Sequence, residues 1–103
     1  MKVNAIGLVS VQGGVRALDR WWCQAMVARH AREQRLRLVD VVELRGEGDG
    51  DSQALRRLAT LAARSGAVAL VTHGVRPDLA DGLAEDLGLR HLLAPDRLGV
   101  PTA

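Results

Sequence analysis

Side chains that could do chemistry follow two apolar stretches of this sequence. Ser10 lies near the end of the first stretch, residues 3–12, just before a glycine pair. His73 and Arg76 follow the second stretch, residues 67–72. A hydroxyl, an imidazole and a guanidinium are groups that attack, move a proton and neutralise an anion. Together they suggest phosphate-ester chemistry at one shared site.

The two stretches are rich in β-branched residues and are apolar on both faces, as is typical of buried strands in a parallel sheet. Catalytic and binding groups in such sheets lie at the carboxyl ends of the strands. The rest of the chain alternates further strands with helices. The expected strands are 3–12, 36–44, 67–72 and 89–94, and the expected helices are 15–34, 52–66 and 77–88.

This alternation predicts an α/β domain of three layers, a four-stranded and mostly parallel sheet in the order 2-1-3-4 with helices on both faces. Strands one and three are then neighbours, and a switch point lies between their ends. Four candidate residues should converge there, namely Ser10, Gln12, His73 and Arg76. The length of 103 residues predicts one domain over 1–95, followed by a tail over 96–103.

Composition excludes several classes of protein. A single cysteine, Cys23, excludes an internal disulfide, and the three histidines lack metal-ligand spacing, so neither a metal nor a cofactor is expected. The sequence shows no signal-peptide pattern and no apolar run near the ~20 residues of a membrane span, which predicts a cytoplasmic protein. Nothing around His30 or His91 in the sequence suggests catalysis. The acidic residues of 77–88 are interpreted as the solvated face of a helix.

Charge is divided unevenly along the chain. Residues 1–37 carry seven basic and two acidic side chains, whereas 38–103 carry seven basic and ten acidic side chains. The basic half could face an anion. The candidate contacts to phosphate or DNA are Arg16, Arg20, Arg29 and Arg76.

The first expected helix is apolar over more of its surface than one sheet face can cover. The stripe expected to face the sheet contains Leu18, Trp22, Ala25, Met26 and Arg29. Off this stripe lie Trp21, Cys23, Val27 and Ala28. Trp21 and Val27 are therefore the predicted centre of a contact with a protein partner or a second copy of the chain. The alternative is that one tryptophan is half-exposed and the other lies in the core.

Six segments, covering most of residues 3–94, carry a family likeness: Ala5–Gln12, Leu18–Arg20, Leu36–Val41, Ala54–Leu58, Val68–Arg76 and Leu89–Leu93. Together they resemble the catalytic domain of the resolvase/invertase serine recombinases. The resemblance implies a serine at the end of the first strand that attacks a DNA phosphodiester. It also implies several arginines that neutralise the phosphate in the transition state.

The chain departs from the family at its first strand and second helix. The family has an arginine two residues before the serine. One register places Ser10 at the arginine and Gln12 at the serine, and a register shifted by two keeps Ser10 as the serine but places Leu8 at the arginine. Ser52 stands where the family has an arginine at the start of the second helix.

The family's Asp-Arg-Leu-x-Arg motif after the third strand is also altered. Val75 replaces the aspartate and Arg76 matches the first arginine. Pro77 replaces the leucine, and Leu79 replaces the second arginine. Losing one group of this kind lowers a rate by a factor of about 10² to 10³. The resemblance therefore implies a catalytically inactive domain, kept as a protein-interaction or regulatory module.

Two other functions fit the residues. One is a small enzyme or a nucleotide- or phosphate-binding protein that uses the switch point. Gly13-Gly14 could admit a phosphate, although the glycine motifs of dinucleotide-binding and P-loop proteins are absent. The other is an accessory protein that binds DNA through the basic half without cutting it.

Overall fold

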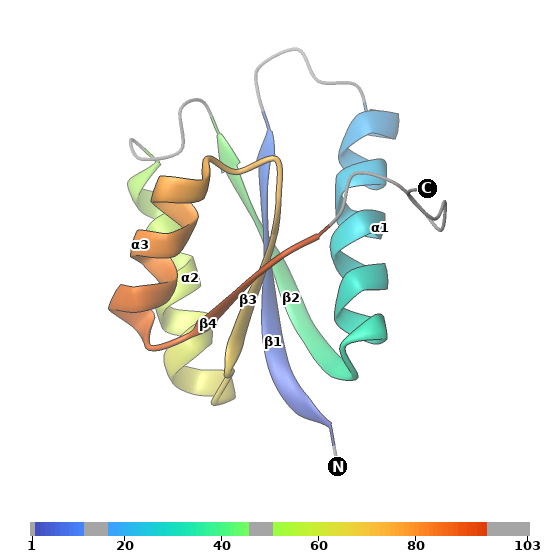
Figure 1. Cartoon of the computed structure of the whole chain (residues 1–103). Coiled ribbons are helices and arrows are strands. Elements are labelled where there is room, and N and C mark those ends of the chain that lie inside the picture. Colours follow the sequence, from blue (N-terminus) through green and yellow to red (C-terminus); the bar gives the residue numbers. More distant parts are fainter. Residues whose placement is uncertain (1, 12–16, 46–50, 95–103) are drawn as a thin grey trace.

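The computed structural model describes residues 2–11, 17–45 and 51–94 of the chain. Its elements in order are β1 (Val3–Val11), α1 (Ala17–Glu33), β2 (Leu36–Arg45), α2 (Ser52–Ser65), β3 (Ala69–His73), α3 (Pro77–Leu87) and β4 (Arg90–Leu93). The sheet has the order β2-β1-β3-β4, and its three strand pairs are all parallel (Figure 1). The predicted α/β fold and strand order are confirmed.

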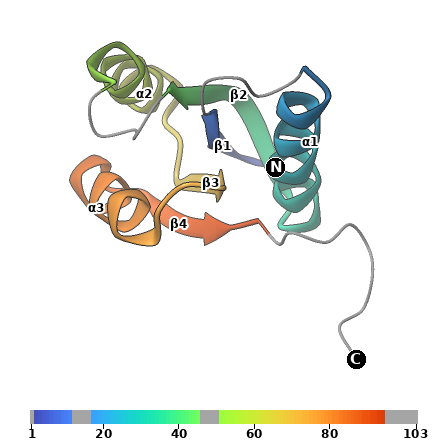
Figure 2. The same ribbon diagram turned by 90° about the horizontal axis from the view of Figure 1, so that it is seen from above.

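The helices form the two outer layers. α1 covers one face of the sheet, and α2 and α3 lie side by side on the other (Figure 2). Right-handed crossovers require this, because the chain moves one way from β1 to β2 and the opposite way from β3 to β4. The switch point between β1 and β3 is therefore present.

Two apolar clusters hold the layers together. Side chains alternate along each strand, so every second residue faces the same helix layer. The cluster under α2 and α3 includes Ile6, Leu8, Val42, Leu44, Leu58 and Leu70. The cluster under α1 includes Ala5, Val9, Met26, Val27 and Val71.

A β-bulge in β2 changes which face its residues point to. Ala5 pairs with Leu38 but Ile6 pairs with Asp40, so Val39 is an extra residue. Beyond it Asp40 faces the α2 side, where its carboxylate accepts a hydrogen bond from Arg57. The bulge therefore lets Asp40 connect the edge strand β2 to α2.

α2 and α3 end and begin where the sequence predicts. Asp51 caps α2, since its Oδ1 accepts from the backbone N–H of Ala54 at 3.1 Å. Pro77 occupies the first turn of α3. Gly66 and Gly88 end the two helices with φ of 65° and 68°, a conformation that favours glycine.

The predicted orientation of α1 is wrong. Val27 is fully buried and packs with Met26 and Ala31 on the sheet, whereas Trp22 is 41% exposed and Arg29 points to solvent. Helical periodicity could not choose the buried stripe because α1 carries apolar residues around most of its circumference. Small residues of the sheet decide which face of α1 is buried.

Gly7 on β1 is the residue that makes room for α1. A Cβ at Gly7 would lie 2.6 Å from Val27 Cγ1 and 3.0 Å from Val41 Cγ2. Val27 therefore enters a space that exists only because position 7 has no side chain. This contact places Val27 in the core and removes it from any surface contact.

Candidate functional site

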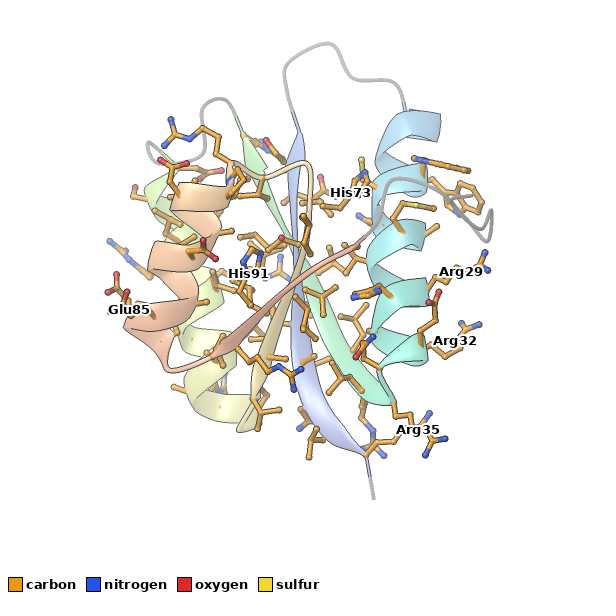
Figure 3. The ribbon with its side chains drawn as sticks, viewed as in Figure 1. Arg29, Arg32, Arg35, His73, Glu85 and His91 are labelled. Carbon is orange, nitrogen blue, oxygen red and sulfur yellow. The ribbon has the colours of Figure 1, made fainter. Side chains whose placement is uncertain are left out.

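Ser10 and His73 do not form a nucleophile and base pair. Both lie at the carboxyl ends of neighbouring strands, where Leu8 pairs with Thr72 and Val9 with His73. Ser10 has the same parity as Leu8 and points toward the α2–α3 side. His73 has the parity of Val71 and points toward α1, as Figure 3 shows. The sheet itself separates the hydroxyl from the imidazole, so the expected convergence of these two is wrong.

The remaining predicted site residues are placed as follows. Gln12 and Arg16 lie outside the described residues, and Arg20 lies in α1 with a side chain outside the described part. Arg76 precedes α3 on the same side of the sheet as Ser10, and its Nε is 3.6 Å from Asp78 Oδ1. Arg29 is similarly close to a carboxylate, 3.2 Å from Glu33 Oε1. A carboxylate beside each guanidinium weakens its attraction for phosphate.

A hydrogen-bonded chain that sequence reasoning missed joins α3 to the sheet. His91 of β4 places its Nδ1 2.6 Å from Asp81 Oδ1 and its Nε2 2.7 Å from Thr72 Oγ1. The tautomer that donates from Nδ1 to Asp81 and accepts the Thr72 hydroxyl proton at Nε2 satisfies all three groups. Figure 3 shows His91 between the sheet and α3.

A carboxylate, an imidazole and a hydroxyl in this order are the parts of a nucleophilic triad. Here the hydroxyl belongs to Thr72, which is fully buried. A substrate cannot reach it, so the chain of hydrogen bonds acts as a clamp between α3, β3 and β4. Asp81 is exposed, as predicted for the solvated face of its helix, but its carboxylate also bonds His91, which the sequence did not indicate.

The outer face of α1 carries the chain's two aromatic residues. Trp21 is 63% exposed and Trp22 is 41% exposed, and the sequence has no Phe or Tyr. Arg29 and Arg32 lie on the same outer face about two turns further along the helix (Figure 3). The hydrophobic core of the described residues is thus aliphatic, and both tryptophans are exposed on α1.

Two hollows lie along α2. One, of about 360 Å³, lies between β2 and the start of α2, and it is lined by Val41, Val42, Glu43, Arg45, Asp51, Gln53, Ala54 and Arg57. The other, of about 430 Å³, is lined by Gln53, Arg56, Arg57, Thr60, Leu61 and Arg64. Neither includes Ser10 or Arg76. The first mixes both charges, and the second is basic.

Asp51 holds together the wall of the first hollow. Its Oδ2 accepts from the backbone N–H of Arg45 at 2.9 Å and its Oδ1 from that of Ala54. These two backbone hydrogen bonds, that of Arg45 first, hold the pKa of the Asp51 carboxyl below its ordinary value of 3.8. A depressed pKa means that the carboxylate stabilises the fold above that ordinary value.

The stabilisation from Asp51 should disappear as the pH falls through its folded-state pKa. We expect Asp51→Asn to lower the melting temperature at pH 7 and to reduce the difference between the melting temperatures at neutral and acidic pH. Thermal unfolding followed by circular dichroism measures both. The neighbouring variant Ser52→Ala should keep the wild-type pH dependence. An unchanged pH dependence in Asp51→Asn would show that the two hydrogen bonds do not favour the charged form.

The described part of the chain holds no group of three His, Cys, Asp or Glu side chains that could bind a metal ion. No helix within the same residues is both long and apolar enough to cross a membrane. Compared with protein-family models, curated proteins and solved structures, the chain matches none.

Proposed function

We propose that this chain is a catalytically inactive domain of the serine recombinase type that works as a protein-binding module through the outer face of α1. The exposure of Trp21 and Trp22 on that face carries the proposal. In a chain with no Phe or Tyr, these two side chains could contribute the most apolar surface to the core, yet both are exposed. Tryptophan and arginine are also the residues that dominate binding energy at protein interfaces.

The arrangement on α1 indicates the chemistry of the partner. The two tryptophans lie near the start of the helix, and Arg29 and Arg32 follow toward its end. A partner segment with apolar side chains followed by carboxylates would bury the indoles and face the guanidinium group of Arg32, and more weakly that of Arg29, which already pairs with Glu33. An acidic, amphipathic segment of another protein is therefore the proposed ligand.

The absence of catalysis is supported by the arrangement of the switch point. Ser10 and His73 point to opposite faces of the sheet, and Arg76 lies beside Asp78. Phosphoryl transfer depends on positioned positive charge around the nucleophile. Ser52 and, depending on the register, Ser10 or Leu8 stand where the family has arginines, so this charge is not assembled among the described residues.

The test is selection of a random peptide library displayed on phage against the purified chain. We expect the selected peptides to combine apolar and acidic residues. Their affinity should fall about thirtyfold or more in Trp21→Ala/Trp22→Ala, because truncating interface hot spots costs about 2 kcal/mol. Isothermal titration calorimetry measures the loss. Both side chains are exposed, so the variant should keep its fold.

Two further variants test whether the peptides bind to α1 or to another surface of the molecule. Thr60→Ala, on the opposite side of the molecule, should bind the peptides like the wild type. Ser10→Ala should also leave the affinity unchanged, because the proposal gives the serine no role. Peptides that bind the double tryptophan variant unchanged, or that need Ser10, would show that α1 is not the binding face.

A further inference from the structure

The two helices on the far side of the sheet from α1 carry opposite charges. α2 contains Arg56, Arg57 and Arg64 and no acidic residue. α3 contains Asp78, Asp81, Glu85 and Asp86 and no basic residue. These side chains are all exposed, and the two helices lie side by side on one face (Figure 2). This face is therefore divided into a basic half and an acidic half.

One ion pair and one hydrogen bond fix how α2 and α3 are each turned about the helix axis. Arg57 contacts Asp40 on β2, and Asp81 contacts His91 on β4. β2 and β4 are the two edges of the sheet. Arg57 and Arg64 on α2 therefore face one edge, and Asp78, Asp81 and Glu85 on α3 face the other. We call Arg57 and Arg64, with the adjacent Arg56, the basic rim, and we call Asp78, Asp81 and Glu85 the acidic rim. Asp86 lies outside the acidic rim, on the side of α3 that carries Leu79 and Leu83.

The flanks of α2 and α3 that face each other are apolar except for the exposed Asp86. The helical period places Leu55, Ala59 and Ala62 on the side of α2 away from Arg57. The same period places Leu79 and Leu83 on the side of α3 away from Asp81. The leucines are half-buried and Ala59 is exposed. A mostly apolar seam therefore runs between the basic and acidic rims, and an apolar centre with a charged periphery is the usual anatomy of a protein interface.

The division of charge selects the kind of partner. A nucleic acid would be attracted to the basic rim but repelled by four carboxylates on the same face. A basic protein would meet the converse repulsion from α2. The occupant must carry an acidic and a basic stripe on either side of an apolar centre.

A second copy of this chain meets that requirement. α2 and α3 both run opposite to the parallel strands, so they point the same way (Figure 1). A two-fold axis parallel to both helices and midway between them places α2 of one copy over α3 of the other. Each basic rim then lies on an acidic rim, and the seams meet.

We propose that the chain forms a homodimer through the α2–α3 face. The contact is isologous, so each ion pair across the rims occurs twice. α1 lies on the opposite side of each copy, and the dimer therefore displays two α1 faces. Two linked binding faces would raise the avidity for a partner that carries two copies of the segment.

The first measurement is the mass of the wild-type chain in solution by sedimentation velocity at several salt concentrations. We expect a dimer whose dissociation constant rises at least about tenfold between about 50 mM and 500 mM salt, because salt screens exposed rims. A chain that is monomeric at low salt and high protein concentration overturns the proposal.

The second measurement exchanges the charges. Arg56→Glu/Arg64→Glu gives the basic rim a net negative charge, so that both rims are acidic, and Asp78→Arg/Glu85→Arg gives the acidic rim a net positive charge, so that both rims are basic. Of these four residues, Asp78 alone has an ion-pair partner within the described part of the chain, and its pair with Arg76 is exposed, so each variant should fold. Neither should dimerise alone. Mixed in equal amounts they should form a heterodimer, because each rim of one variant then meets a rim of opposite net charge on the other.

The matched control is Arg35→Glu/Arg90→Glu, which changes the net charge equally on the other side of the sheet. It should dimerise like the wild type. A third variant, Ala59→Arg, adds a long charged side chain to the exposed part of the seam and should give a monomer. A mixture of the two rim variants that stays monomeric overturns the proposal. So does a wild-type monomer that binds duplex DNA through Arg56 and Arg64.

Discussion

Gly7→Ala is expected to lower the free energy of unfolding by about 3 kcal/mol, the upper part of the usual range for adding atoms to a packed core. The new Cβ would meet Val27 Cγ1 at 2.6 Å, Val41 Cγ2 at 3.0 Å and Leu38 Cδ1 at 3.4 Å. These neighbours are branched and come from two elements, α1 and β2. The approach to Leu38 is an ordinary contact, but no single rotamer change relieves both the contact to Val27 and that to Val41, so α1 must move away from the sheet.

Urea denaturation measures the loss, and a second substitution shows its cause. Val27→Ala removes the methyl groups nearest the new Cβ. The double variant Gly7→Ala/Val27→Ala should therefore be more stable than the sum of the single effects allows. Additive effects would mean that the strain arises elsewhere.

Gly82→Ala is the matched control for the same chemical change. Gly82 lies in α3, and an added Cβ meets nothing within 4 Å. Alanine should stabilise the helix there by about 0.5–1 kcal/mol, because glycine loses more backbone freedom on folding. The same substitution should thus change stability in opposite directions at the two positions.

The contact of Gly7 with Val27 also explains what sequence could predict of the fold. Alternation of apolar strands with helices was sufficient for the α/β class and the order 2-1-3-4. The helix ends at Gly66 and Gly88 were likewise correct. The buried stripe of α1 was predicted wrongly because tryptophan, valine, methionine and alanine occur around most of the helix. Only the space above Gly7 decides between the stripes.

Predicting the candidate site required the register between neighbouring strands, which the sequence of a single strand does not contain. Within one strand the sequence shows that neighbouring residues alternate faces. Whether Ser10 and His73 share a face depends on the register of β1 against β3, which pairs Val9 with His73. An offset of one residue would have placed the hydroxyl and the imidazole on the same side. The strand ends were predictable, and the convergence of their side chains was not.

The His91 clamp could not be predicted for the same reason. Thr72, Asp81 and His91 lie on three different elements, and their spacing in sequence matches no motif. The pairing of Thr72 with Leu93 and of Leu70 with His91 brings the imidazole beside the threonine hydroxyl. Asp81 on α3 then supplies the carboxylate that contacts His91.

His91→Ala is expected to lower the free energy of unfolding by about 1–3 kcal/mol, the range for leaving a buried polar group unsatisfied. Thr72 is fully buried, so its hydroxyl would lose its acceptor without gaining water. Asp81 is exposed, with a side chain 68% accessible, and water can replace its bond to His91. Most of the loss should therefore come from the threonine.

Further variants measure how much of the lost stability comes from Thr72 and how much from Asp81. Asp81→Ala removes the exposed end of the clamp and should cost less than about 1 kcal/mol, because water can take the place of an exposed carboxylate. Thr72→Val removes the hydroxyl that His91→Ala leaves unpaired, so His91→Ala/Thr72→Val should be more stable than His91→Ala alone. If the double variant is less stable than His91→Ala, the imidazole stabilises the chain by packing between α3 and the sheet. The hydrogen bond to Thr72 would then contribute little. The position of α3, and with it the acidic rim, would in that case depend on the volume of His91 and not on its two nitrogen atoms.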